Sequence, residues 1–348
     1  MKKKELQGLQ KTVTTILKTL SPRNRDIIAR RFGLLTGKRE TLESIGSSYQ
    51  ITRERVRQIE EFTLNQLAKG VQENKDIQKY VSLVKSVLQK DGGLMREDHL
   101  FEAVSGNARY DATNAALVFV LSLGDEIVRG DENDRFHAYW ALSNKDQDSF
   151  QESTSSLISA MKKESQPVPV GQLESFVTHQ TGNGVADRRL NTVLAVSKEI
   201  SQNIFGEVGL ASWPEIRPKG VRDKAYLVMK KEGQPRHFGE IASLINKAGF
   251  DNKKVNVQTV HNELIKDNRF VLVGRGMYAL SEWGYKAGTV KDVLVDILRT
   301  SSRPLSRADL IAKVQRARLV KENTIVLNLQ DSSQFVRNDD GTYHLRKA

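Results

Sequence analysis

The sequence predicts a mainly α-helical protein with small β-hairpin wings: a helix-turn-helix domain followed by tandem winged-helix domains. Two observations predict this fold. Within residues 1–70, two short amphipathic helices flank a tight turn at Tyr49-Gln50-Ile51. After residue 70, an amphipathic helix, further helical stretches and two short β-like runs recur at a spacing of roughly 65–70 residues, a repeat that we expect to reflect a repeated structural unit.

The helices of residues 1–70 have clear start and stop signals. Ser21 is expected to cap a helix whose first residue is proline, and Gly33 ends it. A second short helix is expected over residues 41–49. Thr52 is expected to cap the next helix, which continues to about residue 67 with apolar side chains on one face.

The rest of the chain is predicted to form four units. Their opening amphipathic helices are expected at 77–90, 155–164, 222–232 and 290–300. In the third unit, two apolar helix stripes precede a hairpin with a Gly274-Arg275-Gly276 turn, the order of a winged helix. The fourth unit repeats this order, whereas prolines interrupt the second, which is the least regular. The expected domains are 1–70, 71–148, 149–217, 218–286 and 287–348.

Charge is unevenly distributed. The net charge is +12, with +8 in residues 1–70, −5 in 71–150 and −1 in 151–217, then +6 in 218–286 and +4 in 287–348. A basic balance favours an anionic partner, most commonly nucleic acid. The acidic segment in the middle of the chain, residues 71–217, is poorly suited to lie along phosphates. We therefore expect this segment to contact a protein partner.

Several classes of function are not expected. The chain has no cysteine, its six histidines lack metal-ligand spacing, and we find neither a P-loop nor a G-x-S-x-G motif. Glu73-Asn74-Lys75 resembles half of a nuclease motif and has no Pro-Asp upstream. No long apolar run or signal peptide is visible. We therefore expect a cytoplasmic protein with no catalytic, metal, cofactor or small-molecule site and no membrane contact.

The helix after Thr52 carries the strongest functional signal. Its polar stripe has the residue types that read base edges in the major groove: arginine for guanine, glutamine for adenine and glutamate for cytosine. A charged, solvated helix face is the alternative interpretation. The expected base-reading residues are Arg53, Glu54, Arg57 and Gln58. The residues expected to contact the phosphate backbone are Lys38, Arg39, Thr41, Thr52 and Arg55.

These residues carry a family resemblance. The runs from Leu20 to Leu34, Thr41 to Gly46 and Ile51 to Glu60 are similar to region 4 of sigma-70-type RNA polymerase sigma factors, over about residues 15–70. The resemblance implies that this region reads a −35 promoter element and docks on the β flap of RNA polymerase core. It also implies that Arg53, Glu54 and Gln58 contact bases, with Arg57 and Thr41 supporting the backbone. Only a short segment precedes the match, so we expect the promoter-melting region to be absent and the chain not to be a complete sigma factor.

The third unit resembles a second family. The run from Lys224 through His237-Phe238-Gly239 to Leu280 is similar to the HARE-type winged helix, which occurs in the delta subunit of bacterial RNA polymerase. The resemblance does not decide between DNA and protein as its partner. The positive charge of residues 218–286 favours DNA. The expected second DNA surface comprises Lys253, Lys254, Arg269 and Arg275.

Three functions fit the sequence. The first is a bacterial DNA-binding regulator of transcription that reads a −35-type element and contacts RNA polymerase. The second is a polymerase-binding accessory protein whose DNA contact is incidental. The third, an enzyme of a restriction system, lacks each catalytic motif that we searched for.

Overall fold

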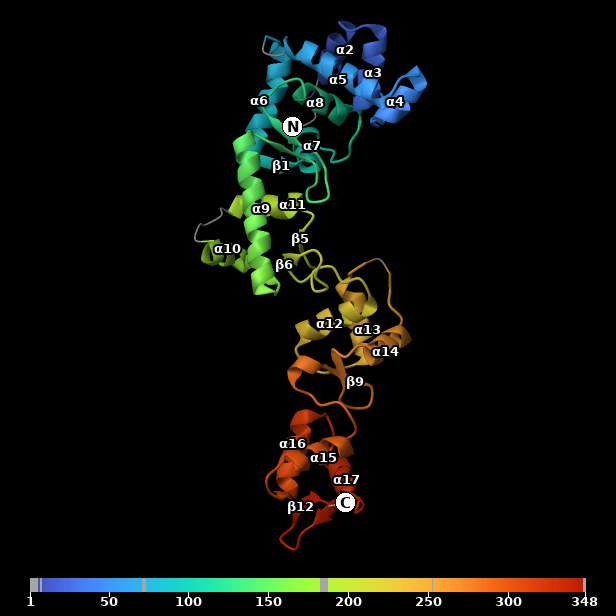
Figure 1. Cartoon of the computed structure of the whole chain (residues 1–348), viewed down its shortest axis with the longest axis vertical. Helices are drawn as coiled ribbons and strands as arrows, with labels where there is room; N and C mark the ends of the chain where they lie inside the picture. Colours follow the sequence, from blue (N-terminus) through green and yellow to red (C-terminus); the bar gives the residue numbers. More distant parts are fainter. Residues whose placement is uncertain (1–5, 7, 71–72, 182–186, 252, 347–348) are drawn as a thin grey trace. The chain divides into compact units, whose positions relative to one another are not determined.

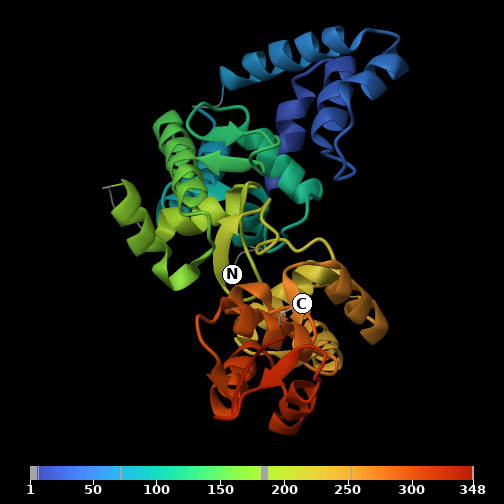
Figure 2. The same cartoon turned by 60° about the horizontal axis from the view of Figure 1, so that its bottom comes forward.

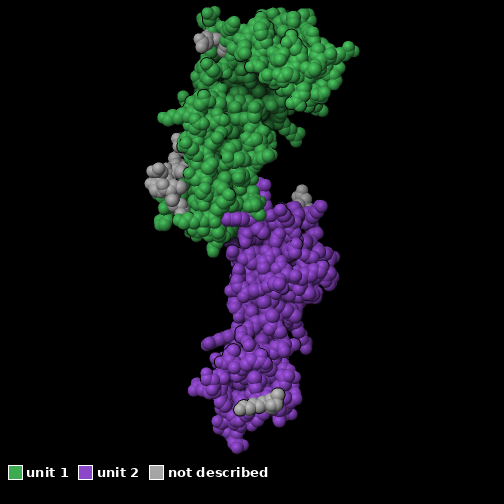
Figure 3. All heavy atoms as spheres, viewed as in Figure 1, with its two compact units in different colours: residues 1–212 green, residues 213–348 purple. Residues whose placement is uncertain are grey.

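The computed structural model describes residues 6, 8–70, 73–181, 187–251 and 253–346, with the side chains of 180–189 left aside. The chain divides into two compact units, residues 1–212 and 213–348, shown in different colours in Figure 3. Across the described residues, no helix combines the length and the apolar character needed to cross a bilayer. Each unit is described by itself below.

Among the described residues of the first unit, the first four helices are α2 (Leu9–Lys18), α3 (Pro22–Phe32), α4 (Leu42–Tyr49) and α5 (Arg53–Ala68). The last two of them form the predicted helix-turn-helix (Figure 1). The hydroxyl oxygens of Ser21, Thr41 and Thr52 accept hydrogen bonds from backbone N–H groups at the starts of α3, α4 and α5. The predicted caps at Ser21 and Thr52 are therefore confirmed. The cap at Thr41 and the helix α2 were not predicted.

The rest of the chain repeats one order of elements four times: helix, strand, helix, helix, strand, strand. The first repeat comprises α6 (Lys75–Lys90), β1 (Leu94–Arg96), α7 (Glu97–Ser105), α8 (Ala112–Leu121), β2 (Val128–Gly130) and β3 (Tyr139–Ala141). The second comprises α9 (Asn144–Glu164), β4 (Val168–Pro169), α10 (Leu173–Thr181), α11 (Asp187–Val196), β5 (Ile200–Gln202) and β6 (Glu207–Leu210), with a short 3-10 turn at Val170–Gln172.

The second unit contains the other two repeats. The third repeat comprises α12 (Val221–Glu232), β7 (Arg236–His237), α13 (Phe238–Ala248), α14 (Val257–Lys266), β8 (Phe270–Leu272) and β9 (Met277–Leu280), followed by a 3-10 turn at Ser281–Trp283. The fourth comprises α15 (Val290–Thr300), β10 (Leu305–Ser306), α16 (Arg307–Ala317), α17 (Glu322–Leu329), β11 (Phe335–Arg337) and β12 (Thr342–Leu345).

In the described part of the chain, each repeat has one antiparallel sheet of three strands, with the last strand of the repeat in the middle. In the third repeat, for example, β9 pairs with β7 through Tyr278 and Arg236, and with β8 through Leu280 and Phe270. This is the strand arrangement of a helix-rich unit with a β-hairpin wing. The predicted fold class, mainly helical with small hairpins, is confirmed, and the division into winged-helix domains stays a prediction.

The helix-turn-helix region and the first repeat share one hydrophobic core. Helix α8 lies at its centre, in contact with α2, α3 and α6, and every side chain from Asn114 to Leu121 is buried. Phe119 of α8 meets Phe32 of α3 edge-on at a ring-centroid distance of 5.3 Å. The hydroxyl of Tyr110 donates a hydrogen bond to the carbonyl oxygen of Phe32 at 2.8 Å. The first repeat is thus part of the platform that carries the helix-turn-helix.

The wing of the first repeat is tied to the second repeat within the same unit. The backbone N–H of His137 donates a hydrogen bond to the carbonyl oxygen of Val196 at 2.9 Å. The backbone N–H of Lys198 donates one to the carbonyl oxygen of Arg135 at 2.8 Å. Helix α9 begins at Asn144, earlier than the predicted start at 155, because Ser143 caps it. It contacts strands of the first repeat and helices of the second, so it runs through the predicted boundary near residue 148. Figure 2 shows α9 from a second direction.

Candidate nucleic-acid interface

A small core of its own holds the helix-turn-helix. Ile27 of α3, Ile45 of α4 and Val56 of α5 are fully buried and pack together, with Tyr49 and Ile59 partly buried around them. Burying these side chains stabilises the angle between α4 and α5, because each of the three helices contributes one of them. The outer face of α5 is therefore free to meet a partner.

The turn between α4 and α5 requires close backbone approach at Gly46. A Cβ atom on Gly46 would lie 2.7 Å from the carbonyl oxygen of Ile51. Gln50 takes the left-handed conformation that ends α4, with φ of 53°. Backbone geometry at these two positions sets the direction in which α5 leaves the turn.

Replacing Gly46 by alanine is expected to loosen the helix-turn-helix. The added Cβ meets a backbone oxygen that cannot move freely, and overpacking of this kind costs about 1–3 kcal/mol. Hydrogen exchange of the α4 and α5 amides should quicken by roughly 5- to 150-fold if these amides exchange through local opening. Gly70→Ala is the control, because its Cβ would meet its nearest atom at 3.9 Å. Unchanged protection in the Gly46 variant would contradict this account of the turn.

The four predicted base-reading residues, Arg53, Glu54, Arg57 and Gln58, are all exposed on α5. Arg57 donates hydrogen bonds to Glu54 (2.8 Å) and to Glu61 (3.0 Å), and the bond from Arg57 lowers the pKa of Glu54. The guanidinium of Arg55 donates to the amide oxygen of Gln58 at 3.0 Å. In this state Glu54, Arg57 and Gln58 are hydrogen-bonded to neighbours on α5, so base contacts by these three residues require them to exchange partners.

Of the predicted phosphate-contacting residues, Lys38 and Arg55 are exposed, and Thr41 and Thr52 serve as helix caps. Arg39 is placed differently from the others. Its guanidinium lies 4.2 Å from the ring centroid of Tyr110 and 3.7 Å from Glu97 of the first repeat. Arg39 therefore contributes to the contact between the helix-turn-helix and the first repeat. Binding of Arg39 to a phosphate would compete with its contacts to Tyr110 and Glu97.

Glu97 lies at the centre of this contact between the helix-turn-helix and the first repeat. Its carboxylate is 12% exposed and accepts hydrogen bonds from Arg129 (2.7 and 3.1 Å) and from the indole N–H of Trp140 (3.0 Å). A carboxylate this buried is stable in its ionised form when cationic groups and hydrogen-bond donors surround it. Arg129 and Trp140 provide these groups here. Sequence reasoning did not find this cluster, since its members are up to 101 positions apart.

A second set of ion pairs positions α3 against the reading helices. Arg30 donates to both carboxylate oxygens of Glu40, at 3.0 and 2.7 Å, and lowers the pKa of that carboxyl group. Arg31 donates to Glu60 of α5 at 2.9 Å. These arginines lie in the basic segment 1–70, yet they are engaged inside the region instead of being available to DNA.

The predicted second surface lies in the third repeat. Lys253, Lys254 and Arg275 are exposed and form no ion pair with a carboxylate in the described residues. Arg269 differs, because its guanidinium pairs with Asp223 at 2.9 Å and with Asp267 at 2.7 Å. The hydrogen bond from Arg269 lowers the pKa of Asp267. Arg269 is therefore held within the repeat.

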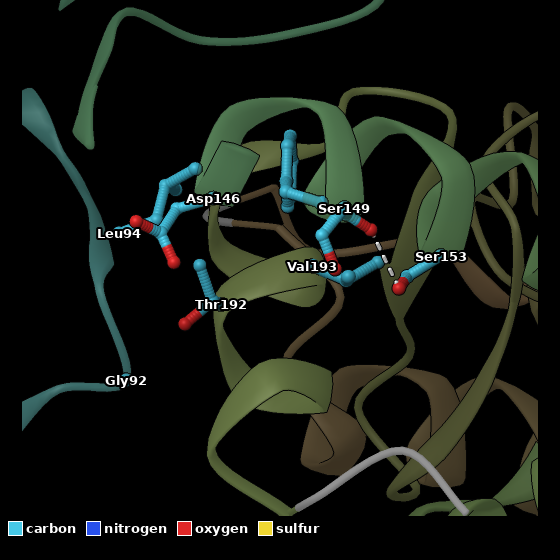
Figure 4. Close-up of a pocket in the computed structure, with 8 residues that line it drawn as sticks. Gly92, Leu94, Asp146, Ser149, Ser153, Thr192 and Val193 are labelled. Atoms are coloured by element: carbon cyan, nitrogen blue, oxygen red, sulfur yellow. Dashed lines mark hydrogen bonds between the residues drawn. The ribbon is translucent and has the colours of Figure 1, made fainter. Parts of the chain in front are cut away.

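Three cavities in the first unit are small. One of about 20 Å³ lies between α9, α11 and the segment before β1 (Figure 4), with room for about one water molecule. Ser153 and Ser149 line it from α9, and Thr192 and Val193 line it from α11. Two others, of about 250 and 230 Å³, share Arg96 and fall below the usual range of ligand pockets. Among the described residues, no cluster of three or more histidines or carboxylates is arranged to hold a metal ion.

Comparison with known proteins bears on the helix-turn-helix. Residues 16–69 match the family Sigma-70, region 4. Over 59 residues, the chain is 48% identical to RNA polymerase sigma factor SigA of Microcystis aeruginosa and to SigA of Synechocystis sp.. It is 44% identical to SigA of Clostridium acetobutylicum over the same length. The match covers 17% of this chain and 14% to 16% of these relatives. The predicted resemblance of this region is confirmed.

Proposed function

We propose that the chain is a DNA-binding regulator of transcription that works with RNA polymerase. The exposed polar face of α5, on a region that matches Sigma-70 region 4, is the observation that supports this function most strongly. Arg53 and Gln58 would read base edges of a −35-type element, and Lys38 and Arg55 would contact phosphates. Glu54 and Arg57 would join the base contacts once their mutual ion pair opens.

The runner-up proposal is a polymerase-binding accessory protein in which DNA contact is incidental. The acidic balance of residues 71–150 favours a protein-facing surface there. Helices α2 and α3 bury apolar side chains against the first repeat. A polymerase element such as the β flap would have to dock on the surfaces of the helix-turn-helix that the first repeat leaves open.

Co-purification of RNA polymerase with the full chain separates the two proposals. We expect polymerase to be retained after nuclease treatment, because we propose a direct protein contact. The same preparation should bind a promoter duplex in the absence of polymerase. Loss of polymerase after nuclease treatment would contradict the protein contact. Binding of polymerase without any affinity for duplex DNA would replace the first proposal by the second.

A further inference from the structure

The four repeats differ in what happens to their third helix. In the first repeat, α8 is buried in the core shared with the helix-turn-helix. In the second, α11 packs against β1 of the first repeat and against α9. In the fourth, α17 exposes Leu327, and Glu322 at its start lies 3.5 Å from Arg307. These three helices are engaged within the chain or lack an excess of positive charge.

Helix α14 of the third repeat is different. Helix α14 packs against α12 and α13 with Val260 and Leu264 buried, and its opposite face is exposed. That face presents Gln258 and Asn262, whose side chains are joined by a 3.2 Å hydrogen bond. Three nearby carboxylates are already engaged: Asp251 with Lys224 at 2.6 Å, Asp267 with Arg269, and Glu263 of α14 with Lys266 at 3.8 Å.

The exposed cations come from two segments that pack against α13 at different places. A Cβ atom on Gly276 in the wing turn would lie 2.9 Å from the ring of Phe238, so the backbone that follows Arg275 lies next to that ring. The same ring stacks on His261 of α14, with centroids 4.3 Å apart. A Cβ on Gly239 would lie 4.0 Å from Val257, the first residue of α14. The wing turn with Arg275 therefore lies by the start of α13. Lys253 and Lys254 come just before Val255, whose backbone exchanges hydrogen bonds with the side chain of Asn246 near the end of α13.

We infer that the third repeat binds the phosphate backbone of duplex DNA through this face, which we call the α14 surface: Lys253, Lys254, Gln258, Asn262 and Arg275. The three cations supply charge complementarity, and the amide side chains lie on the helix between the two basic segments. The cations that supply the affinity contact phosphates, which carry no sequence information, so this binding is expected to depend little on sequence. The sequence analysis grouped Arg269 with these cations. Its ion pairs within the repeat give Arg269 a structural role instead.

This second DNA contact lies in the unit of residues 213–348, apart from the helix-turn-helix in residues 1–212. It does not depend on the proposed reading of a −35-type element. The full chain would therefore hold DNA at two places, one that selects sequence and one that adds affinity. Such an arrangement raises the affinity for DNA that can reach both contacts.

The salt dependence of DNA binding tests the inference. The probe is a 40-base-pair duplex without a −35-type element, and the binding constant of the full chain is measured from low to moderate salt. Each neutralised phosphate contributes about 0.9 to the slope of log K against log salt. The Lys253→Ala, Lys254→Ala, Arg275→Ala variant should lower that slope by about 2 to 3.

The matched control removes the same charge elsewhere in the unit. Lys231, Arg299 and Lys313 are exposed, lie on α12, α15 and α16, and can be replaced together by alanine. The control variant should keep the wild-type slope. An unchanged slope in the α14-surface variant, or an equal fall in the control, would overturn the inference. A helix-turn-helix variant, Arg53→Ala with Gln58→Ala, distinguishes the two contacts, since it should lose preference for a promoter site while the α14 surface still binds.

Discussion

Replacing Arg53 and Gln58 together by alanine is expected to abolish the preference of the chain for a −35-type site. Both side chains are exposed at the start of α5, so their removal leaves the core of the helix-turn-helix intact. A well-formed contact to a base edge contributes about 1–3 kcal/mol of discrimination. Loss of two contacts therefore lowers the ratio of specific to non-specific binding by roughly 30-fold to 10⁴-fold.

Competition between promoter and unrelated duplexes measures this ratio. The matched control is Gln66→Ala with Lys69→Ala, which removes one glutamine and one cation from the far end of the same helical segment. The control should retain the wild-type preference, because a recognition helix reads DNA with its N-terminal turns. A control that loses specificity as fully as the Arg53 and Gln58 variant would place the reading face elsewhere.

Truncating Phe119 to alanine is expected to destabilise the helix-turn-helix region and the first repeat together. Phe119 is fully buried in their shared core and contacts Phe32 of α3. Removing a buried phenylalanine side chain costs about 3–5 kcal/mol, from lost burial and the cavity left behind. Urea unfolding should show this loss, and hydrogen exchange should show weaker protection in α3 and α8 alike.

The exposed Phe62 provides the control for this variant. It is 67% exposed on α5, so Phe62→Ala should change stability by about 0.5 kcal/mol or less. If the Phe119 variant lost protection in the first repeat and kept it in α2 and α3, the two parts would not form one cooperative platform.

Local signals predicted much of the fold. The caps at Ser21 and Thr52 depend on residues three positions apart, so they could be predicted from the sequence. The hairpin around Gly276 could be predicted for the same reason, because a positive φ at the turn favours glycine. The exposed face of α5 followed from helical spacing.

Interactions between distant segments could not be predicted in this way. Helix α8 has apolar side chains all round, and its sequence does not say that α2 and α3 provide the other half of the core. Arg39 looked like a free cation because its carboxylate partner, Glu97, lies far away along the chain. Arg269 pairs with the distant Asp223 as well as with its neighbour Asp267. The start of α9 was misplaced because its first turns are polar and its packing comes from both neighbouring repeats.

The most direct test of the central claim is selection of bound sequences from a pool of random duplexes by the full chain. Our account expects the wild-type chain to enrich one short element of the −35 type. The Arg53→Ala, Gln58→Ala variant should bind DNA and enrich no element, since the α14 surface remains. Enrichment of the same element by the variant, or no enrichment by the wild type, would contradict the proposal that α5 reads promoter DNA.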